Sequence, residues 1–182
     1  MPTFFTSDTH FGDHRVLNLY PRPFGSVAEM DAELICRWNA RVGAEDEVWH
    51  LGDFARTAKR AAEILAQLNG VKHLIVGNND PSPGRVEGWA SVAAYAEIEA
   101  EGKKLVLCHY PFRSWNGQHR GALNLHGHSH GRIKPLPRQH DVGVDVRDYR
   151  PVTLSEILSP LAARGRGDSA CRGLRRRRIF RP

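Results

Sequence analysis

The chain has 182 residues and a mass of 20.4 kDa, which is enough for one domain with a substantial buried core. Hydrophobic residues make up 41% and charged residues 25%, a mixture that excludes disordered chains, fibrous repeats and coiled coils. No stretch approaches the ~18 apolar residues of a membrane helix, and the first residues lack a secretory signal, so we expect no membrane partner. The three cysteines are widely spaced without a CxxC motif, which favours a reducing cytoplasm over a disulfide framework.

The positive charge of the chain is concentrated at its C-terminal end. The formal net charge is +6, yet residues 160–182 hold eight arginines against one acidic residue, which leaves residues 1–159 nearly neutral. We therefore predict a single domain over 1–159 and a basic, disordered tail over 160–182, since the tail has few apolar residues. The Arg172–Arg181 cluster in this tail raises a second hypothesis, a nucleic-acid-binding protein or a nuclease.

The first half of the chain alternates strand and helix signals. A β-rich strand is expected over 3–7, followed by a helix that begins after Ser26, where Ser26 and Glu29 match a capping box, and runs to Val42. A strand over 47–51, a helix over 57–68 and a buried strand over 73–76 follow. This order predicts a layered α/β fold with parallel strands.

The second half is richer in strand signals. Strands over 92–99 and 104–108 flank a plausible hairpin turn at 101–103, and further strands are expected over 122–126 and 142–146. A short helix is expected over 153–158. We predict a second, more antiparallel sheet packed against the first.

Metal-ligating residue types follow almost every predicted strand. In α/β sheets, ligands bind beyond the carboxyl ends of the strands, where several loops converge. Each fragment alone is common in proteins, but their joint occurrence at strand ends predicts a metal centre. The set comprises two carboxylates, one amide and four imidazoles: Asp8, His10, Asp53, Asn78, His109, His128 and His130.

The composition of this set favours particular metals. Mixed oxygen and nitrogen ligands without thiolate suit borderline divalent ions, with Mn²⁺ first and Fe, Zn, Ni or Co as alternatives. Seven side chains exceed what one catalytic ion takes, because such an ion needs an open position for water. Two divalent ions that share a carboxylate accommodate the set, and such a centre stabilises charge on phosphoryl oxygens.

These blocks resemble the signature motifs of the calcineurin-like metallophosphoesterase superfamily over residues 3–158. The motifs are Asp8-x-His10, Gly52-Asp53, Gly77-Asn78, His109 and Gly127-His-Ser-His130. Phe-Thr-Ser-Asp-Thr-His-Phe-Gly, Trp-His-Leu-Gly-Asp-Phe and Val-Gly-Val-Asp-Val further resemble small bacterial and phage members. The resemblance implies a four-layer αββα sandwich and two-metal hydrolysis of a phosphodiester or phosphomonoester through attack by a metal-bridging hydroxide.

The resemblance also implies how the ligands divide. Asp53 would bridge the two ions. Asp8, His10 and His130 would complete the first ion's set, and Asn78, His109 and His128 would complete the second. Asp53 and His109 are therefore expected to be catalytic as well as metal-binding.

One motif departs from the family pattern. Superfamily members usually carry histidine after Gly-Asn, near the leaving-group oxygen, but this chain has Asn79 there. Asn79 is expected to act in catalysis and substrate binding, yet an amide donates a hydrogen bond without releasing a proton near neutral pH. Three explanations stay open: an engineered substitution, a substitute donor such as His14 or His119, or a weakened enzyme.

Substrate contacts are expected from residues beside the ligand motifs. Arg56 and Arg113 offer bidentate forks for phosphate oxygens, and Asn116 lies in the same loop as Arg113. With Asn79, these residues would hold a small phosphate ester or nucleotide. The sequence leaves open the physiological substrate, the choice between monoester and diester, and the oligomeric state.

Deletion of residues 160–182 separates the two functional hypotheses. If the tail is accessory, manganese-dependent hydrolysis of a nitrophenyl phosphodiester should persist unchanged, because the ligand motifs all precede residue 160. Steady-state kinetics of the full and shortened chains measure this. A large loss of turnover would assign the tail a part in the reaction.

Overall fold

A computed structural model describes residues 1–81 and 83–159. The predicted domain over 1–159 thus falls almost wholly within the described part. The basic segment 160–182, and with it the nucleic-acid hypothesis, lies outside. Among the described residues, none of the helices combines the length and the apolar character needed to cross a bilayer.

The first sheet has the strand order β4-β3-β2-β1-β9. As predicted, β1 (Thr3–Thr6), β2 (Glu47–His50) and β3 (Val71–Ile75) are parallel neighbours. The parallel arrangement extends to β4 (Ser91–Ala93). The antiparallel edge strand β9 (Val152–Thr153) was not predicted, because its pairing with β1 spans only two residues.

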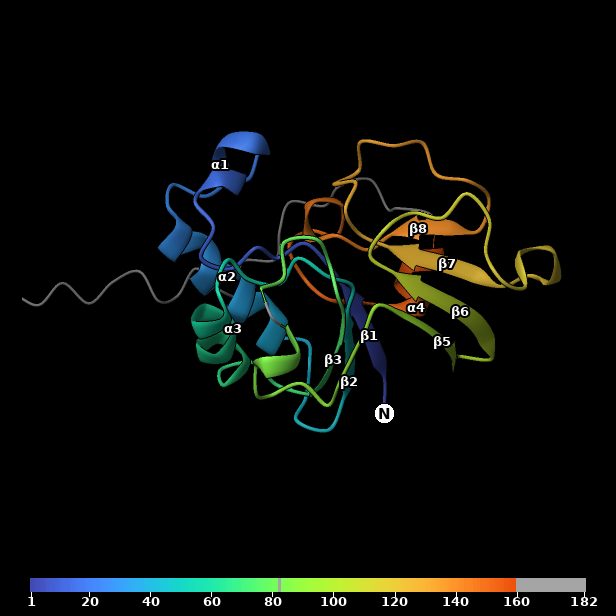
Figure 1. The fold of residues 1–182 in the computed structure, drawn as a ribbon, viewed down its shortest axis with the longest axis horizontal. Helices are drawn as coiled ribbons and strands as arrows, with labels where there is room; N and C mark the ends of the chain where they lie inside the picture. Colours follow the sequence, from blue (N-terminus) through green and yellow to red (C-terminus); the bar gives the residue numbers. More distant parts are fainter. Residues whose placement is uncertain (82, 160–182) are drawn as a thin grey trace, which may run out of the picture.

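Helices cover one face of this sheet (Figure 1). α2 (Val27–Asn39) connects β1 to β2, and α3 (Ala58–Leu65) connects β2 to β3. Both confirm predicted helices but end three residues earlier than expected. A short helix that sequence analysis missed, α1 (Arg15–Leu19), precedes α2. Apolar side chains between helices and sheet form one buried cluster that includes Phe4, Met30, Leu34, Trp38, Val48, Ile64 and Leu74.

Side-chain caps fix where the helices begin. The Ser26 hydroxyl accepts a hydrogen bond from the Glu29 amide at 3.1 Å, and the Glu29 carboxylate accepts from the Gly25 amide at 3.0 Å. The predicted helix near the C-terminal end of the domain is α4 (Leu154–Leu158), where Thr153 and Glu156 form a reciprocal capping box. Caps of this kind satisfy amide groups that the first helical turn leaves unpaired.

The second sheet has the order β5-β6-β7-β8. Its strands are β5 (Tyr95–Ala100), β6 (Lys103–Cys108), β7 (Leu123–His126) and β8 (Gln139–Asp141). The predicted antiparallel character is correct only for the β5–β6 hairpin, since β6, β7 and β8 run parallel. The chain between β6 and β7, which contains η2 (Gln118–Arg120), returns across the sheet and lets both strands point the same way.

The two sheets pack face to face across a second apolar cluster (Figure 1). It contains Phe5, Leu51, Ile75, Leu105, Leu107, Leu125, Val142 and Leu154. The fold is therefore α/β with two stacked sheets and flanking helices, as predicted. On the outer side of the second sheet, Val106 packs against Trp115 and Ala122 of the connecting segment.

Two predicted strands are wrong in detail. The segment predicted as one strand over 92–99 divides at Ala94, with β4 in the first sheet and β5 in the second. The segment 142–146 forms η3 (Val144–Val146) instead of a strand. A turn is favoured there because the Asp141 carboxylate accepts from the Gly143 amide at 2.8 Å and the Val146 amide donates to the Gly143 carbonyl at 3.1 Å. A further 3-10 turn, η1 (Pro83–Arg85), precedes β4.

Ile75→Ala tests the packing between the sheets. Ile75 has no exposed surface, so the cavity should lower the free energy of unfolding by about 2–5 kcal/mol in urea denaturation. Leu19→Ala is the matched control, because Leu19 is 60% exposed and its loss should cost less than about 0.5 kcal/mol. Equal losses in the two variants would contradict the assigned core.

Candidate metal centre

The loops that carry the seven expected ligands meet at one rim, beyond the carboxyl ends of β1, β2, β3, β6 and β7. Backbone hydrogen bonds join these loops directly. The Asp8 amide donates to the Gly52 carbonyl at 2.9 Å, and the His10 amide donates to the Asp53 carbonyl at 3.0 Å. The Gly127 amide donates to the His109 carbonyl at 3.0 Å, which ties the β6 and β7 loops together.

Most of the expected ligands have a backbone conformation that non-glycine residues avoid. Such left-handed residues cost about 1–3 kcal/mol each and cluster at functional sites. Because the strain recurs in three separate loops, the surrounding fold holds these side chains in place. The residues and φ angles are Asp8 (58°), His10 (54°), Asp53 (57°), His128 (64°) and His130 (47°).

Glycines next to the ligands are required by close approach between loops. A Cβ atom on Gly127 would lie 2.0 Å from the Ser7 hydroxyl and 2.4 Å from Asp8 Oδ2. On Gly77 it would lie 2.4 Å from Asp53 Oδ1. Real Cβ atoms do not approach so closely, so a side chain at either position would push the aspartates out of the site.

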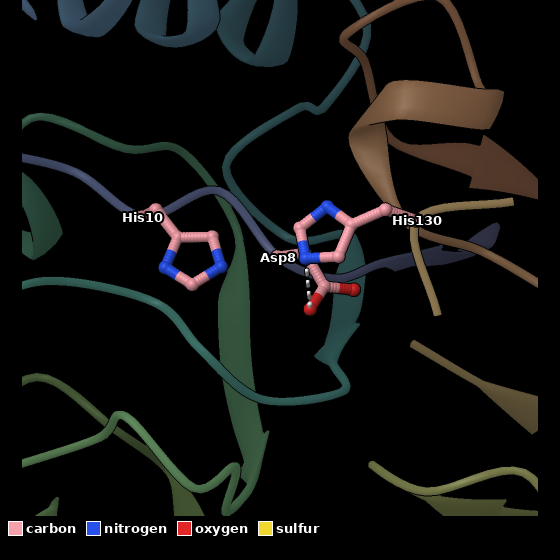
Figure 2. A group of neighbouring side chains, drawn as sticks. All are labelled: Asp8, His10 and His130. Atoms are coloured by element: carbon pink, nitrogen blue, oxygen red, sulfur yellow. Dashed lines mark ion pairs between the residues drawn. The ribbon is translucent and has the colours of Figure 1, made fainter. Parts of the chain in front are cut away.

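Asp8, His10 and His130 form the first group of side chains able to share an ion (Figure 2). His130 Nε2 lies 3.7 Å from Asp8 Oδ1, and the rings of His10 and His130 stack with centroids 5.5 Å apart. His10 Nε2 is buried without a hydrogen-bond partner and lies 3.6 Å from Asp53 Oδ2. An orphaned buried nitrogen that faces a carboxylate is the arrangement a cation would satisfy.

Asp8, Asp53 and His109 form the second group. His109 Nδ1 lies 2.7 Å from the Leu51 carbonyl, which only accepts, so Nδ1 carries the proton. In the neutral ring, the lone pair on Nε2 then faces Asn78 Oδ1 at 3.1 Å and Asp53 Oδ1 at 3.6 Å. Three acceptor atoms with no proton between them fit a metal ion.

The expected division of the ligands stays a prediction. Asp8 belongs to both groups, whereas the resemblance made Asp53 the shared carboxylate. Asp53, a member of the second group, also reaches the first, since its oxygens are each 3.6 Å from a different imidazole, His10 and His109. Among the described residues, His128 joins neither group, although its ring centroid is 5.1 Å from that of His109.

The electrostatics of the cluster favour a bound cation. Burial raises the pKa of the Asp8 carboxyl well above its ordinary value, and the charges of Asp141 and Asp53 raise it further. Burial lowers the pKa of His10 to about 4, and burial followed by the charge of His109 lowers that of His128. The imidazoles of His10 and His128 are thus kept neutral, as metal ligands must be, and the buried Asp8 carboxylate lacks compensating charge.

Asn79 contacts the aspartate between the two groups. Its amide nitrogen donates to Asp53 Oδ1, and its side-chain Nδ2 donates to Asp53 Oδ2, both at 2.7 Å. Asn79 therefore holds the Asp53 carboxylate from two sides. His14 and His119, the alternative proton donors, are both exposed.

Three of the four expected substrate-binding residues make no polar contact with this cluster in the described part of the chain. Arg56 and Arg113 have exposed side chains, and Asn116 Nδ2 donates to the Glu97 carboxylate on β5 at 2.9 Å. Within residues 1–81 and 83–159, no hydrogen bond or ion pair joins these three residues to the expected ligands. Their contact with substrate stays a prediction.

Sequence analysis missed the carboxylates that hold the ligand loops. Asp80 accepts hydrogen bonds from the amides of Asp53, Phe54 and Gly77 at 2.7–2.9 Å, which fixes two loops at once. Asp141 accepts from the Ser129 hydroxyl at 2.6 Å and so orders the loop of the two C-terminal histidines. Asp80 ends the Gly-Asn-Asn-Asp motif, which is a usable signal, whereas Asp141 has no motif that marks it.

Arg22 and Asp145 were also missed. Arg22 has a fully buried side chain and pairs with Asp145, whose carboxylate accepts from His130. Burial alone would raise the pKa of Asp145, but the hydrogen bond from His130 and the charge of Arg22 outweigh it and lower that pKa. Asp145 lies in the Val-Gly-Val-Asp-Val motif, whereas nothing in the sequence marks Arg22.

Comparison with known proteins agrees with this geometry. The chain is 34% identical over 165 residues to an uncharacterized protein of Methanocaldococcus jannaschii, covering 85% of this chain and 88% of the relative. It is 33% identical over 175 residues to the gene 66 protein of Mycobacterium phage D29, covering 78% and 86% respectively. The crystal structure of a protein of unknown function from Aquifex aeolicus matches with a TM-score of 0.68 and 26% identity, covering 86% of this chain and 97% of that one.

A family model identifies the superfamily to which the chain belongs. The model of the calcineurin-like phosphoesterase superfamily domain matches residues 1–143, which include all seven expected ligands. The chain therefore belongs to the calcineurin-like phosphoesterase superfamily, and it is a metal-dependent hydrolase of phosphoric esters.

Proposed function

We propose that this protein uses two divalent metal ions to hydrolyse a small phosphomonoester or phosphodiester, such as a nucleotide. The observation that carries the proposal is the position of Asp53, whose two oxygens each lie 3.6 Å from an imidazole Nε2 of a different ligand loop. A carboxylate placed this way suits a bridge between two ions. Mn²⁺ suits the nitrogen and oxygen donors, with Fe, Zn, Ni or Co as alternatives.

The ligands divide between the two ions as follows. Asp8, His10 and His130 would hold the first ion, Asn78, His109 and His128 would hold the second, and Asp53 would contribute to both, as the family resemblance implies. Two ions in this position would generate a nucleophilic hydroxide from water at neutral pH and neutralise charge that develops on the phosphoryl oxygens.

The remaining residues orient this centre and the substrate. Asn79 donates two hydrogen bonds to Asp53. Its side-chain amide therefore orients the proposed bridging carboxylate, and a contact with the leaving group would be additional. An amide releases no proton, so the chain acts best on esters whose leaving group departs as an anion. The exposed cations Arg56 and Arg113 remain available to anionic parts of the substrate, and Asn116 is proposed to act with them. We propose the cytoplasm as the location, since the three cysteines are few and widely spaced, without a CxxC motif.

Asp53→Ala tests the bridge. The variant should lose both ions and fall to background turnover, and the loss of metal affinity should exceed the about 100-fold that removal of an outer-shell partner costs. Inductively coupled plasma mass spectrometry counts the ions, and manganese-dependent hydrolysis of a nitrophenyl phosphodiester gives turnover. Removal of metal from the wild type with a chelator should abolish turnover, and added Mn²⁺ should restore it.

Asp46→Ala is the matched control for the bridge. Asp46 precedes β2 at the opposite end of the strand and accepts a hydrogen bond from the Gly43 amide at 2.8 Å. This variant should retain both ions and turnover. Retention of two ions by Asp53→Ala would contradict the assignment of Asp53 as the bridging carboxylate.

Asn79→His tests the missing proton donor. A histidine there should raise turnover of esters with poor alkyl leaving groups, toward the ~10²–10⁴-fold that general acid catalysis contributes, and affect nitrophenyl esters less. The ratio of the two rates in wild type and variant is the measurement. Asn18→His places a histidine on an exposed position of α1 and should leave the ratio unchanged. No change of the ratio in Asn79→His would show that proton donation does not limit the reaction.

A further inference from the structure

We propose that Arg22 and Asp145 are a positioning pair that sets the geometry and strength of one half of the metal centre, the group Asp8, His10 and His130. The inference rests on the proposed two-metal function. Of the two residues, Asp145 lies past residue 143, where the matched family segment ends.

The first link of the pair is the bond between Asp145 and His130. His130 Nδ1 lies 2.7 Å from Asp145 Oδ2, so the ring donates from Nδ1 and keeps the lone pair on Nε2. Nε2 faces Asp8 Oδ1 at 3.7 Å. A carboxylate that accepts from a ligating imidazole fixes its tautomer and orientation and raises its basicity toward the metal.

The second link is the bidentate bond from Arg22 to the same carboxylate. Arg22 Nε donates to Asp145 Oδ1 at 2.9 Å, and Nη2 donates to Oδ2 at 2.8 Å. The guanidinium group has no exposed surface, and its planar fork matches the carboxylate. Asp145 is therefore held at both oxygens and cannot rotate away from His130.

The third link runs from Arg22 to the loop after β1. Nη2 also donates to the Asp8 carbonyl at 2.7 Å, and Nη1 donates to the Thr9 carbonyl at 3.0 Å. Asp8 and His10 flank Thr9 and both have the left-handed backbone described above. One buried side chain thus stabilises the strained loop of two ligands and, through Asp145, the third.

The other half of the centre is oriented by different chemistry. His109 donates from Nδ1 to the backbone carbonyl of Leu51 at 2.7 Å, and a neutral carbonyl polarises the imidazole less than a carboxylate does. Asp145 therefore acts on one half only, because it contacts His130, which belongs to the first group alone. This asymmetry distinguishes a positioning role from general structural support, which would affect both ions alike.

The test is Asp145→Asn, which removes the charge and keeps the size of the side chain. Titration of metal-stripped protein with Mn²⁺ by isothermal titration calorimetry should show two ions in wild type. In the variant, one ion should bind about 10–100-fold more weakly and the other should be unchanged. Urea denaturation of the metal-stripped proteins reports stability in parallel.

Glu156→Gln is the matched control. The Glu156 carboxylate accepts from Arg41 at 2.6 Å and from Arg150 at 2.9 Å, beside the N-terminal half of β1 and away from the rim. It is an arginine-bound carboxylate like Asp145, but it touches no expected ligand. This variant should bind both Mn²⁺ ions as the wild type does.

Two further measurements cover the case in which Asp145→Asn does not fold. Long-range ¹H–¹⁵N spectra of the wild type should show His130 as the Nδ1–H tautomer. Arg22→Lys should also bind the weakened ion more tightly than Arg22→Met, because lysine keeps the charge that methionine lacks.

The outcomes separate this inference from the proposed function. Unchanged affinity for both ions in Asp145→Asn, equal weakening of both, an Nε2–H tautomer at His130, or no gain from Arg22→Lys over Arg22→Met would overturn the positioning role. A wild type that binds fewer than two Mn²⁺ ions would overturn the proposed two-metal centre itself.

Discussion

The structure depends on the convergence of buried acceptor atoms at one rim. Asp8 and Asp53 are almost completely buried, and their oxygens face imidazole nitrogens that carry lone pairs. Burial of charge without compensation is costly and raises the pKa of Asp8, and positive charge between the loops would stabilise the ionised cluster. The left-handed backbone of five ligands and the glycines beside the ligands bring backbone and carboxylates unusually close at this rim.

Sequence patterns predicted the structure best where ligand residue types follow segments with clear strand or helix periodicity. The β-α-β-α-β order and the ligand at each strand end could be predicted, because parallel strands deliver their carboxyl ends to one edge. The division at Ala94 could not, since each half-strand satisfies the same alternation in a different sheet. Residues 142–146 look like a strand, yet the Asp141 carboxylate captures the Gly143 amide and turns the chain.

The groups that hold the ligands were harder to predict than the ligands. Arg22 is 123 residues from Asp145 in sequence, so no local pattern reveals that they pair. Asn116 shows a further limit, because its loop follows a ligand strand while its side chain binds Glu97, a contact that no local pattern marks. The motif predicted Asn79 beside the ligands, but the motif alone gave no sign that its amide would bond to Asp53.

The passage of the chain from β4 to β5 has a mechanical consequence for the whole molecule. Only Ala94 separates the two strands, so this segment is hydrogen-bonded to β3 on one side and to β6 on the other. Because β4 and β5 are joined by one residue, separation of either sheet would disturb the strand pairing in the other. The layers should therefore melt in a single cooperative step, and the rim they share keeps its shape until the entire domain comes apart.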